Sequence, residues 1–326
     1  MNHWQQRQKN VLATIFLAAV MFSTSSIAQN SSSEDTPLPD WLRAPYLNVV
    51  MSVNDESAMR EFYGDVLGLE PLSDLLLSPR RGRPAAVTMV RFKLGRSQIK
   101  MLLHNQDPPP GASPQRADGE KPPPIPERSP GGRATANGLR LLSFPTDDGK
   151  SLAARIQDWN GTTVEWLSES TYKVAWVKDP DDNEIELRWY QTGSPELSQL
   201  ELALTVNDLE RSLTHYGKIL ALPPLSTVER AGFNGKTYQF QVGDSILRVW
   251  SPGKKLPVDT GWTKNGFGLR YVQFIVKDAY ALHDHLIESG AGIAQTPTPL
   301  GGGATLLFAK DPDGVINECV GPAKKE

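Results

Sequence analysis

An internal repeat constrains the fold of this chain more than any other feature of its sequence. Residues 53–69 read "VNDESAMREFYGDVLGL" and residues 206–222 read "VNDLERSLTHYGKILAL", so that the identical positions lie 153 residues apart without a gap. A second pair of similar segments is "DPDDNEIELRWY" and "DPDGVINECV", and each has a glutamate, Glu186 or Glu318, seven residues after its first aspartate. Matches of this length at one fixed spacing indicate a duplication within the chain.

Each copy has the pattern of a strand, a helix and then several strands. Apolar and β-branched residues predict the opening strands, "LNVVMSV" and "LELALTV". Asp55 and Asp208 follow these strands, at the expected N-cap of a helix whose apolar residues recur at helical spacing. The segments downstream of each copy follow the same pattern more loosely, which predicts four such units along the chain.

The motifs "FYGDVLGL" and "DPDDNEIEL", both echoed in the second half of the chain, resemble those of the vicinal oxygen chelate superfamily. Glyoxalase I, bleomycin-resistance proteins and extradiol dioxygenases belong to this superfamily. The resemblance implies an α+β fold in which four βαβββ modules pair into two domains, residues 46–191 and residues 198–322. Each domain is then an eight-stranded, curled, mixed sheet around a cavity, with its helices outside. We therefore expect module one to pair with module two, and module three with module four.

The first 28 residues have the three-part layout of a secretory signal peptide. Arg7 and Lys9 precede a twelve-residue apolar run, and small residues end at Ala28. Since the run is short for a bilayer, we expect cleavage and a location in a bacterial periplasm or outside the cell, without membrane attachment. An uncleaved anchor is the alternative. Residues 29–45 are expected to form an N-terminal linker.

A proline- and glycine-rich insertion, residues 107–134, lengthens the first domain. Such a composition does not bury a core, so the segment is either an inert surface loop or a lid over a cavity. We expect limited proteolysis to cut first near Arg116 or Arg128 and to leave both domains folded.

Metal ligands in this superfamily, as the resemblance implies, come from the first and the last strand of each module. The first-strand position lies seven residues before the aspartate that caps the helix, which gives Asn48, Glu201 and Tyr271. The last strands supply Lys100, Glu186, Arg248 and Glu318. No histidine occupies any of these positions. A divalent metal (Mn, Fe, Ni or Zn) would therefore depend on Glu318, Glu201 and Glu186, and otherwise we expect no cofactor.

The expected module pairing places these residues in two cavities. In the first, Asn48 lies near Lys100 and Glu186, and the latter two form a structural ion pair. In the second, a cluster of titratable groups is suited to acid–base chemistry. The predicted catalytic residues are Glu318, Glu201 and Tyr271. The predicted substrate-binding residues are Arg248, Lys100, Asn48 and His104.

Two functions of different classes fit this sequence. The first is an exported enzyme that acts on a small oxygen-rich molecule as an isomerase, a lyase or a dioxygenase, and the paired glutamates favour it. The second is a non-catalytic protein that binds or sequesters a small molecule, and the missing histidines favour it. The net charge of −3 gives no indication of a nucleic-acid partner. We expect a small-molecule partner and either a monomer or a homodimer.

Overall fold

The computed structural model describes residues 37–77, 87–103, 131–191, 199–263, 266–300 and 302–324. The predicted signal peptide, residues 29–36 of the linker, His104 and residues 107–130 of the insertion lie outside this described part. No helix in the described part is both long enough and apolar enough to cross a membrane.

The predicted βαβββ unit occurs four times. Module one contains β1 (Leu42–Val53), α2 (Glu56–Arg60), β2 (Glu70–Leu77), β3 (Val87–Leu94) and β4 (Ser97–Leu103). Module two contains β5 (Gly138–Thr146), α3 (Gly149–Asn160), β6 (Leu167–Ser168), β7 (Lys173–Lys178) and β8 (Glu184–Trp189). Module three contains β9 (Glu201–Thr205), α4 (Leu209–Thr214), β10 (Val228–Glu229), β11 (Lys236–Val242) and β12 (Ser245–Trp250). Module four contains β13 (Gly268–Val276), α5 (Ala279–Glu288), β14 (Gly292–Leu300), β15 (Ala304–Lys310) and β16 (Ile316–Pro322).

The repeated "VND" segments begin the helices of modules one and three, as predicted. The side chains of Asp55 and Asp208 each accept a hydrogen bond from a backbone N–H in the first turn, which satisfies one of the unpaired donors there. Both helices continue as a π-helical turn, which contains Tyr63 in module one and Tyr216 in module three. The two tyrosines are fully buried.

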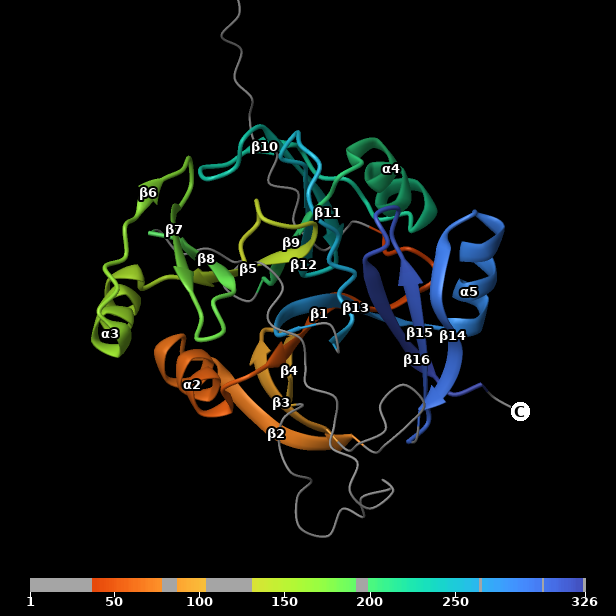
Figure 1. The fold of residues 1–326 in the computed structure, drawn as a ribbon, viewed down its shortest axis with the longest axis horizontal. Coiled ribbons are helices and arrows are strands. Elements are labelled where there is room, and N and C mark those ends of the chain that lie inside the picture. The colour runs from red at the N-terminus through yellow and green to blue at the C-terminus, as the bar shows by residue number, and fades with distance from the viewer. Residues whose placement is uncertain are drawn as a thin grey trace, which may run out of the picture. The chain divides into compact units, whose positions relative to one another are not determined.

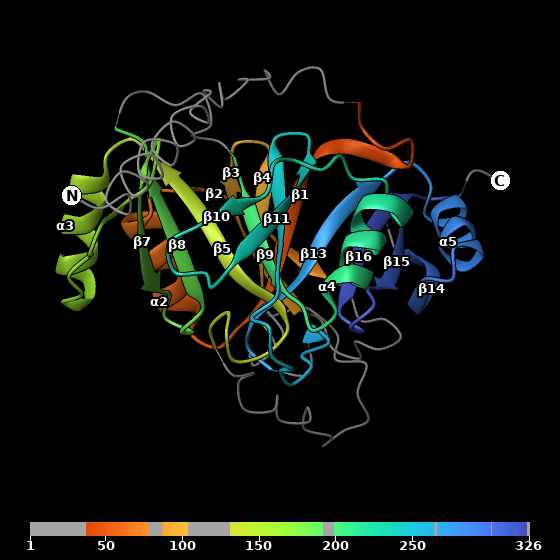
Figure 2. The same cartoon turned by 90° about the horizontal axis from the view of Figure 1, so that it is seen from above.

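The strands form two eight-stranded sheets (Figures 1 and 2). The first sheet has the order β14-β15-β16-β13-β1-β4-β3-β2, and the second has the order β10-β11-β12-β9-β5-β8-β7-β6. At the centre of the first sheet, β1 pairs antiparallel with β13, and at the centre of the second, β5 pairs antiparallel with β9. Module one therefore shares a sheet with module four, and module two shares a sheet with module three.

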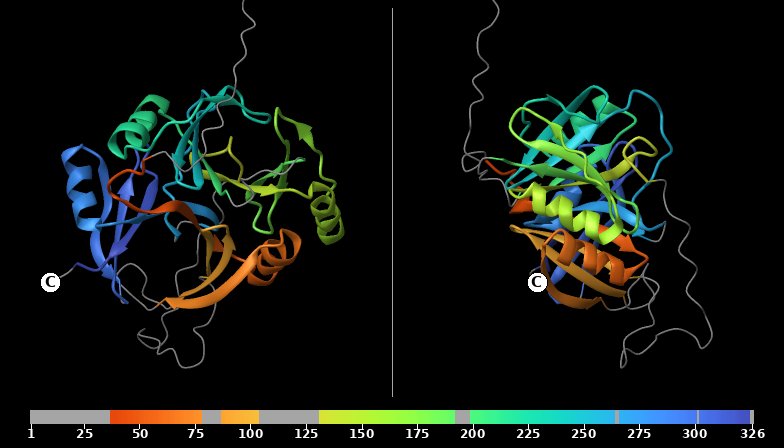
Figure 3. Two further views of the ribbon diagram at one scale, coloured as in Figure 1. Left: turned by 180° about the vertical axis from the view of Figure 1, so that it is seen from behind. Right: turned by 90° about the vertical axis from the view of Figure 1, so that its left-hand side faces the viewer.

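The expected pairing of modules one with two and three with four is wrong for the sheets. Modules that are neighbours in the sequence contact each other through their helices instead, as Figure 3 shows for α2 beside α3 and α4 beside α5. The rings of Phe62 and Trp159 lie 5.0 Å apart in the first of these contacts. In the second, the His285 side chain lies 2.9 Å from the carbonyl oxygen of Ile219. The apolar core on the helix side is continuous across all four modules.

The two acidic turns, "DPDD" and "DPDG", join the sheets. Asp179, at the end of the second sheet, accepts a hydrogen bond from the Tyr63 hydroxyl of module one at 2.9 Å. Asp311, in the first sheet, accepts one from the Tyr216 hydroxyl of module three at 3.2 Å. The duplicated tyrosines and aspartates are thus partners across the joint.

Candidate functional site

Both sheets carry polar side chains at the centre of the face that the helices do not cover. Along β8, Ile185 and Leu187 belong to the helix-side core, so Glu186 between them lies on the opposite face. The same alternation places Glu318 opposite the buried Cys319 on β16. These helix-free faces correspond to the cavity faces expected from the sequence, and they differ in chemistry between the two sheets.

Four side chains form a hydrogen-bonded polar row across the first sheet: Asn48, Lys100, Gln273 and Glu318. The Gln273 amide is its centre, because its Oε1 accepts from Asn48 Nδ2 at 2.8 Å and from Lys100 Nζ at 2.6 Å. Its Nε2 donates to Glu318 Oε2. Asn48 Oδ1 accepts from the backbone N–H of Gln98 at 2.7 Å. The row is buried except for Lys100, which is partly exposed.

The Lys100 ammonium of the polar row has a shifted pKa. Burial lowers its pKa from the ordinary value, the Glu318 carboxylate opposes this change, and the positive charge of Arg91 adds to it. Desolvation disfavours the charged form of a lysine. Lys100 therefore releases its proton more readily than a lysine on the surface.

An apolar surface adjoins the polar row on the same face. Tyr271 lies two residues from Gln273 on β13 and packs edge-on against Phe308, with their ring centroids 5.4 Å apart. Trp262 continues this aromatic group, with its ring 4.9 Å from that of Phe308. The other buried members of this apolar cluster are Val50, Val87, Leu102, Leu306 and Ile316. A few polar groups beside aromatic and aliphatic walls are typical of small-molecule sites.

The equivalent position of the second sheet holds an ion cluster: Glu186, Glu201, Arg188, Arg230 and Arg248. Arg248 donates to both oxygens of Glu186, at 3.0 and 2.8 Å, and its Nε lies 3.2 Å from Glu201. Arg188 forms an ion pair with Glu201. Arg230 lies 3.4 Å from Glu186 and 3.3 Å from Glu201.

The arginines keep both glutamates of the ion cluster ionised. Burial acts to raise the pKa of Glu186, but Arg248 and Arg230 outweigh it and lower that pKa to about 2. The pKa of Glu201 is likewise lowered, because Arg188 and Arg230 outweigh its burial. Ser143 donates a further hydrogen bond to Glu186 at 2.7 Å.

The residues of neither sheet fit a divalent metal ion. In the polar row, the amide oxygens of Asn48 and Gln273 already accept hydrogen bonds, and a lysine ammonium lies where a cation would have to bind. In the ion cluster, three guanidinium groups surround the two carboxylates. Their positive charges repel a metal cation. No three histidine, cysteine, aspartate or glutamate side chains of the described residues form a group that could hold a metal.

The structure corrects how the predicted residues are grouped. Glu186 pairs with Arg248 and not with Lys100, because β8 and β4 belong to different sheets. Glu318 shares its face with Tyr271, as expected, but Glu201 lies in the other sheet and joins Glu186. The catalytic and substrate-binding roles given to these residues stay predictions.

Several side chains at these sites were not predicted from the sequence. Gln273 and Ser143 lie five residues before their capping aspartates, Asp278 and Asp148, whereas the interval is seven in modules one and three. The two intervals differ by two residues, and alternate residues of a strand share a face. Gln273 and Ser143 therefore lie on the same face as residues at the seven-residue interval. A single polar residue within the apolar strands "YVQFIV" and "LLSF" was the available signal. Arg188 was also predictable from the sequence, because it lies two residues beyond Glu186 and therefore on the same face of the strand.

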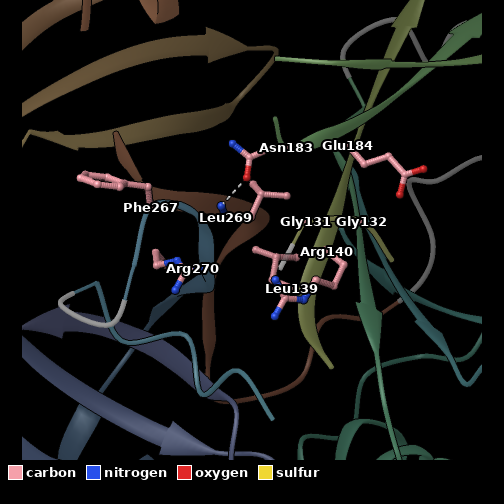
Figure 4. Close-up of a pocket in the computed structure, with 9 residues that line it drawn as sticks. All are labelled: Gly131, Gly132, Leu139, Arg140, Asn183, Glu184, Phe267, Leu269 and Arg270. Atoms are coloured by element: carbon pink, nitrogen blue, oxygen red, sulfur yellow. Dashed lines mark hydrogen bonds between the residues drawn. The ribbon is translucent and has the colours of Figure 1, made fainter. Parts of the chain in front are cut away.

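A narrow cleft lies where β5 approaches β13 (Figure 4). Arg140 and Arg270 line it, and both bind Asp259, at 2.8 and 3.0 Å. Asn183 Oδ1 accepts from the backbone N–H of Leu269 at 2.8 Å across the same joint (dashed line in Figure 4). The space suffices for about one water molecule, so this cleft is part of the contact between the sheets.

A larger cleft, of about 510 Å³, opens beside the second sheet. Glu184 and Trp250 line it, and each lies two residues from a member of the ion cluster, Glu186 or Arg248, along the same strand. Alternate residues of a strand point to the same face. The cleft therefore adjoins the face that carries the ion cluster.

Comparison with known families agrees with this architecture. The model of the Glyoxalase/Bleomycin resistance protein/Dioxygenase superfamily matches residues 46–187 and again residues 198–319. The chain belongs to this superfamily. The two matched segments each contain two sequence-adjacent modules, and the sheets are completed between the segments.

Individual members of this superfamily are similar to parts of the chain or to its fold. A probable lactoylglutathione lyase of Vibrio parahaemolyticus is 27% identical over 126 residues, which is 37% of this chain and 88% of that protein. A lactoylglutathione lyase of Haemophilus influenzae is 28% identical over 120 residues, 35% of this chain and 85% of that protein. The crystal structure of glyoxalase I from Zea mays superimposes with a TM-score of 0.61 at 18% identity, over 84% of this chain and 91% of that chain. At that identity the superposition shows the fold alone.

Proposed function

We propose that the first sheet binds a small, oxygen-rich organic molecule without the help of a metal ion. The observation that carries this proposal is the polar row beside the aromatic cluster, with Lys100 partly exposed at their boundary. The polar row holds the oxygen atoms of the ligand, and Tyr271 and Phe308 contact its carbon skeleton. Membership of the superfamily supports a small-molecule ligand, because the family includes bleomycin-resistance proteins as well as enzymes.

Lys100 selects the chemistry of the ligand. One of its three ammonium protons is donated to Gln273 Oε1, so two remain for ligand oxygens. A carbonyl, enolate or carboxylate oxygen accepts these protons, and the charge of the ammonium favours an oxygen with negative charge. The neighbouring Glu318 is an acceptor for a ligand hydroxyl.

A second candidate function is proton transfer, as in an isomerase or a lyase. The lowered pKa of Lys100 favours it, because a general base works best when its pKa lies near the working pH. In such a reaction the neutral Lys100 amine takes a proton from the carbon next to a carbonyl and returns it to a neighbouring atom. The lactoylglutathione lyases among the relatives make lactoylglutathione one compound to test.

Binding is tested by thermal shift of the purified protein with catechol, pyruvate, lactate and lactoylglutathione. At least one compound should raise the melting temperature, and Lys100→Met should weaken its binding at least tenfold. Lys93→Met is the matched control, since Lys93 is an exposed lysine on the neighbouring strand β3 that pairs with Glu70. Equal affinity in the wild type and Lys100→Met would contradict the proposal.

Turnover is tested with the same ligands in D2O. NMR measures the exchange of ligand C–H protons for deuterium. Exchange that is present in the wild type and abolished in Lys100→Met supports proton transfer. Binding without exchange supports the non-catalytic function.

We further propose that the protein is exported. The support is the signal-like sequence of residues 1–28. Cell fractionation should find a shortened chain that begins near Gln29 outside the cytoplasm, and an intact chain in the cytosol would contradict export.

A further inference from the structure

The ion cluster of the second sheet contains more positive than negative charge. It has three guanidinium groups and, among the described residues, two carboxylates. The side chains of Arg188 and Arg248 are buried, and that of Arg230 is 10% exposed. Because arginine stays protonated in proteins, the cluster carries one buried positive charge that its own carboxylates do not balance. Such a charge is costly unless a counter-charge is nearby.

Tyr172, which lies at the cluster, does not provide this counter-charge. Tyr172 lies under Arg230, whose guanidinium carbon is 5.7 Å from its ring, and Arg188 donates to the Tyr190 hydroxyl at 3.1 Å. Burial raises the pKa of Tyr172 to about 12, even though Arg230 acts to lower it. Tyr172 is therefore neutral at physiological pH.

Hydrogen-bond donors of the cluster are also unused. Among the described residues, the buried Nε atoms of Arg188 and Arg230 have no hydrogen-bond partner. The same holds for Arg248 Nε and Glu201 Oε2, which lie 3.2 Å apart. A buried donor without an acceptor costs the free energy of its desolvation. A hydrogen-bond acceptor with a negative charge would both balance the extra positive charge and pair with the unused donors.

The larger cleft lies beside this place, although its lining includes no member of the ion cluster itself. Gly232 lines the cleft and lies in the same turn as Arg230. The apolar part of the lining includes Trp250 and Pro252, and Lys254 contributes a positive charge. A volume of about 510 Å³ with an apolar wall accommodates an organic molecule and not only an inorganic ion.

We propose that the second sheet binds a small organic monocarboxylate, whose carboxylate pairs with Arg230 and whose carbon skeleton lies in the cleft against Trp250. One negative charge balances the cluster, and two carboxylate oxygens match the fork of a guanidinium group. The site is separate from the ligand site of the first sheet. In the superfamily that the sequence resembles, these strand positions carry metal ligands. In the second sheet of this chain, the same positions bind an anion instead.

The test is a titration of the full-length protein with sodium benzoate, sodium acetate and sodium chloride at constant ionic strength, followed by thermal shift and calorimetry. Benzoate should raise the melting temperature in a saturable way and bind more tightly than acetate, while chloride should have little effect. Arg230→Gln leaves two arginines and two glutamates, so it should weaken benzoate binding at least tenfold.

Two control variants show whether benzoate binds at Arg230 or at another cationic side chain. Arg133→Gln should keep the benzoate response, because Arg133 lines the same cleft but is already paired with Glu184. Lys100→Met should keep it as well, because Lys100 lies in the first sheet; a response lost only in this variant would place the anion at the polar row and overturn the proposal.

Two further results would overturn it. The first is the absence of any benzoate response while Arg230→Gln lowers the melting temperature at every anion concentration, which would make the cluster a purely structural ion network. The second is an equal response to chloride and benzoate, which would make the ligand an inorganic ion.

Discussion

Replacing Glu186 with glutamine tests how strongly the ion cluster stabilises the fold. The substitution keeps the size of the side chain and removes a carboxylate that is 1% exposed and bound by both Nη atoms of Arg248. The pKa of Glu186 falls from 4.5 to about 2 in the folded protein, and at about 1.4 kcal/mol per pH unit this corresponds to about 3 kcal/mol of stability. Breaking a buried ion pair by removing one partner costs a similar 3–5 kcal/mol or so.

We therefore expect Glu186→Gln to lower the free energy of unfolding by about 3 kcal/mol at pH 7. Urea unfolding followed by tryptophan fluorescence and circular dichroism measures this loss. Glu318→Gln is the matched control, because Glu318 occupies the equivalent last-strand position of the first sheet but accepts its hydrogen bond from an amide, Gln273. The control should stay within a few degrees of the wild-type melting temperature. A loss below about 1 kcal/mol, or equal losses in both variants, would show that the ion cluster does not stabilise the fold through Glu186.

The same substitution has a predicted pH dependence. A carboxyl group whose pKa is lower in the folded state stabilises the fold above its unfolded pKa, and this stabilisation is lost as the pH falls through the folded pKa. For Glu186 the loss should run from about pH 4.5 down to about pH 2. The glutamine variant should lack this part of the acid unfolding profile.

Three other substitutions test features of the helices, the acidic turns and the contact between the sheets. Burial lowers the pKa of His215 to about 4, and its buried Nε2 has no hydrogen-bond partner among the described residues. The wild type should therefore lose roughly 2 kcal/mol of unfolding free energy between pH 8 and pH 5. In unfolding measurements, His215→Phe should lack this loss. Burial raises the pKa of Asp179 to about 7, so wild-type stability should decrease as the pH rises from about 4 to about 7, and Asp179→Asn should flatten this slope in the same measurements. Gly243→Ala should lower the melting temperature strongly, because its Cβ would lie 2.1 Å from the Pro45 carbonyl oxygen, whereas Gly235→Ala, at a similar positive φ but in open space, should cost far less.

Local features of the fold were predictable because they depend on neighbouring residues. The fixed spacing of Asp55 and Asp208 identified the modules, and the period of two along β8 and β16 placed Glu186 and Glu318 on the helix-free faces. These properties follow from backbone geometry and from the need to bury one face of each strand.

The pairing of the modules was not predictable in this way. Each module offers the same kind of first strand as a partner, so the order in a sheet depends on contacts between distant segments that no local pattern encodes. Because the pairing was predicted wrongly, Glu186 was expected near Lys100 and Glu201 near Glu318. The structure places the members of each pair in different sheets. Gln273 was missed for a different reason, since the link between strand and helix is two residues shorter in module four than in module one.

The nested arrangement of the sheets has a consequence for how the chain is made. The second sheet is built from residues 138–250, one continuous segment, whereas the first sheet takes its strands from both sides of that segment. The hydrogen bond between Asn48 and Gln273 alone joins residues 225 positions apart. During synthesis from the N-terminus, β1–β4 emerge first but have no partner for β1 until module four appears, while the second sheet is already complete in sequence. Since contacts between distant residues form slowly, we expect the second sheet, with the ion cluster, to fold before the first sheet, with the polar row. A chain that stops after module two would have two half-sheets and no central strand pair.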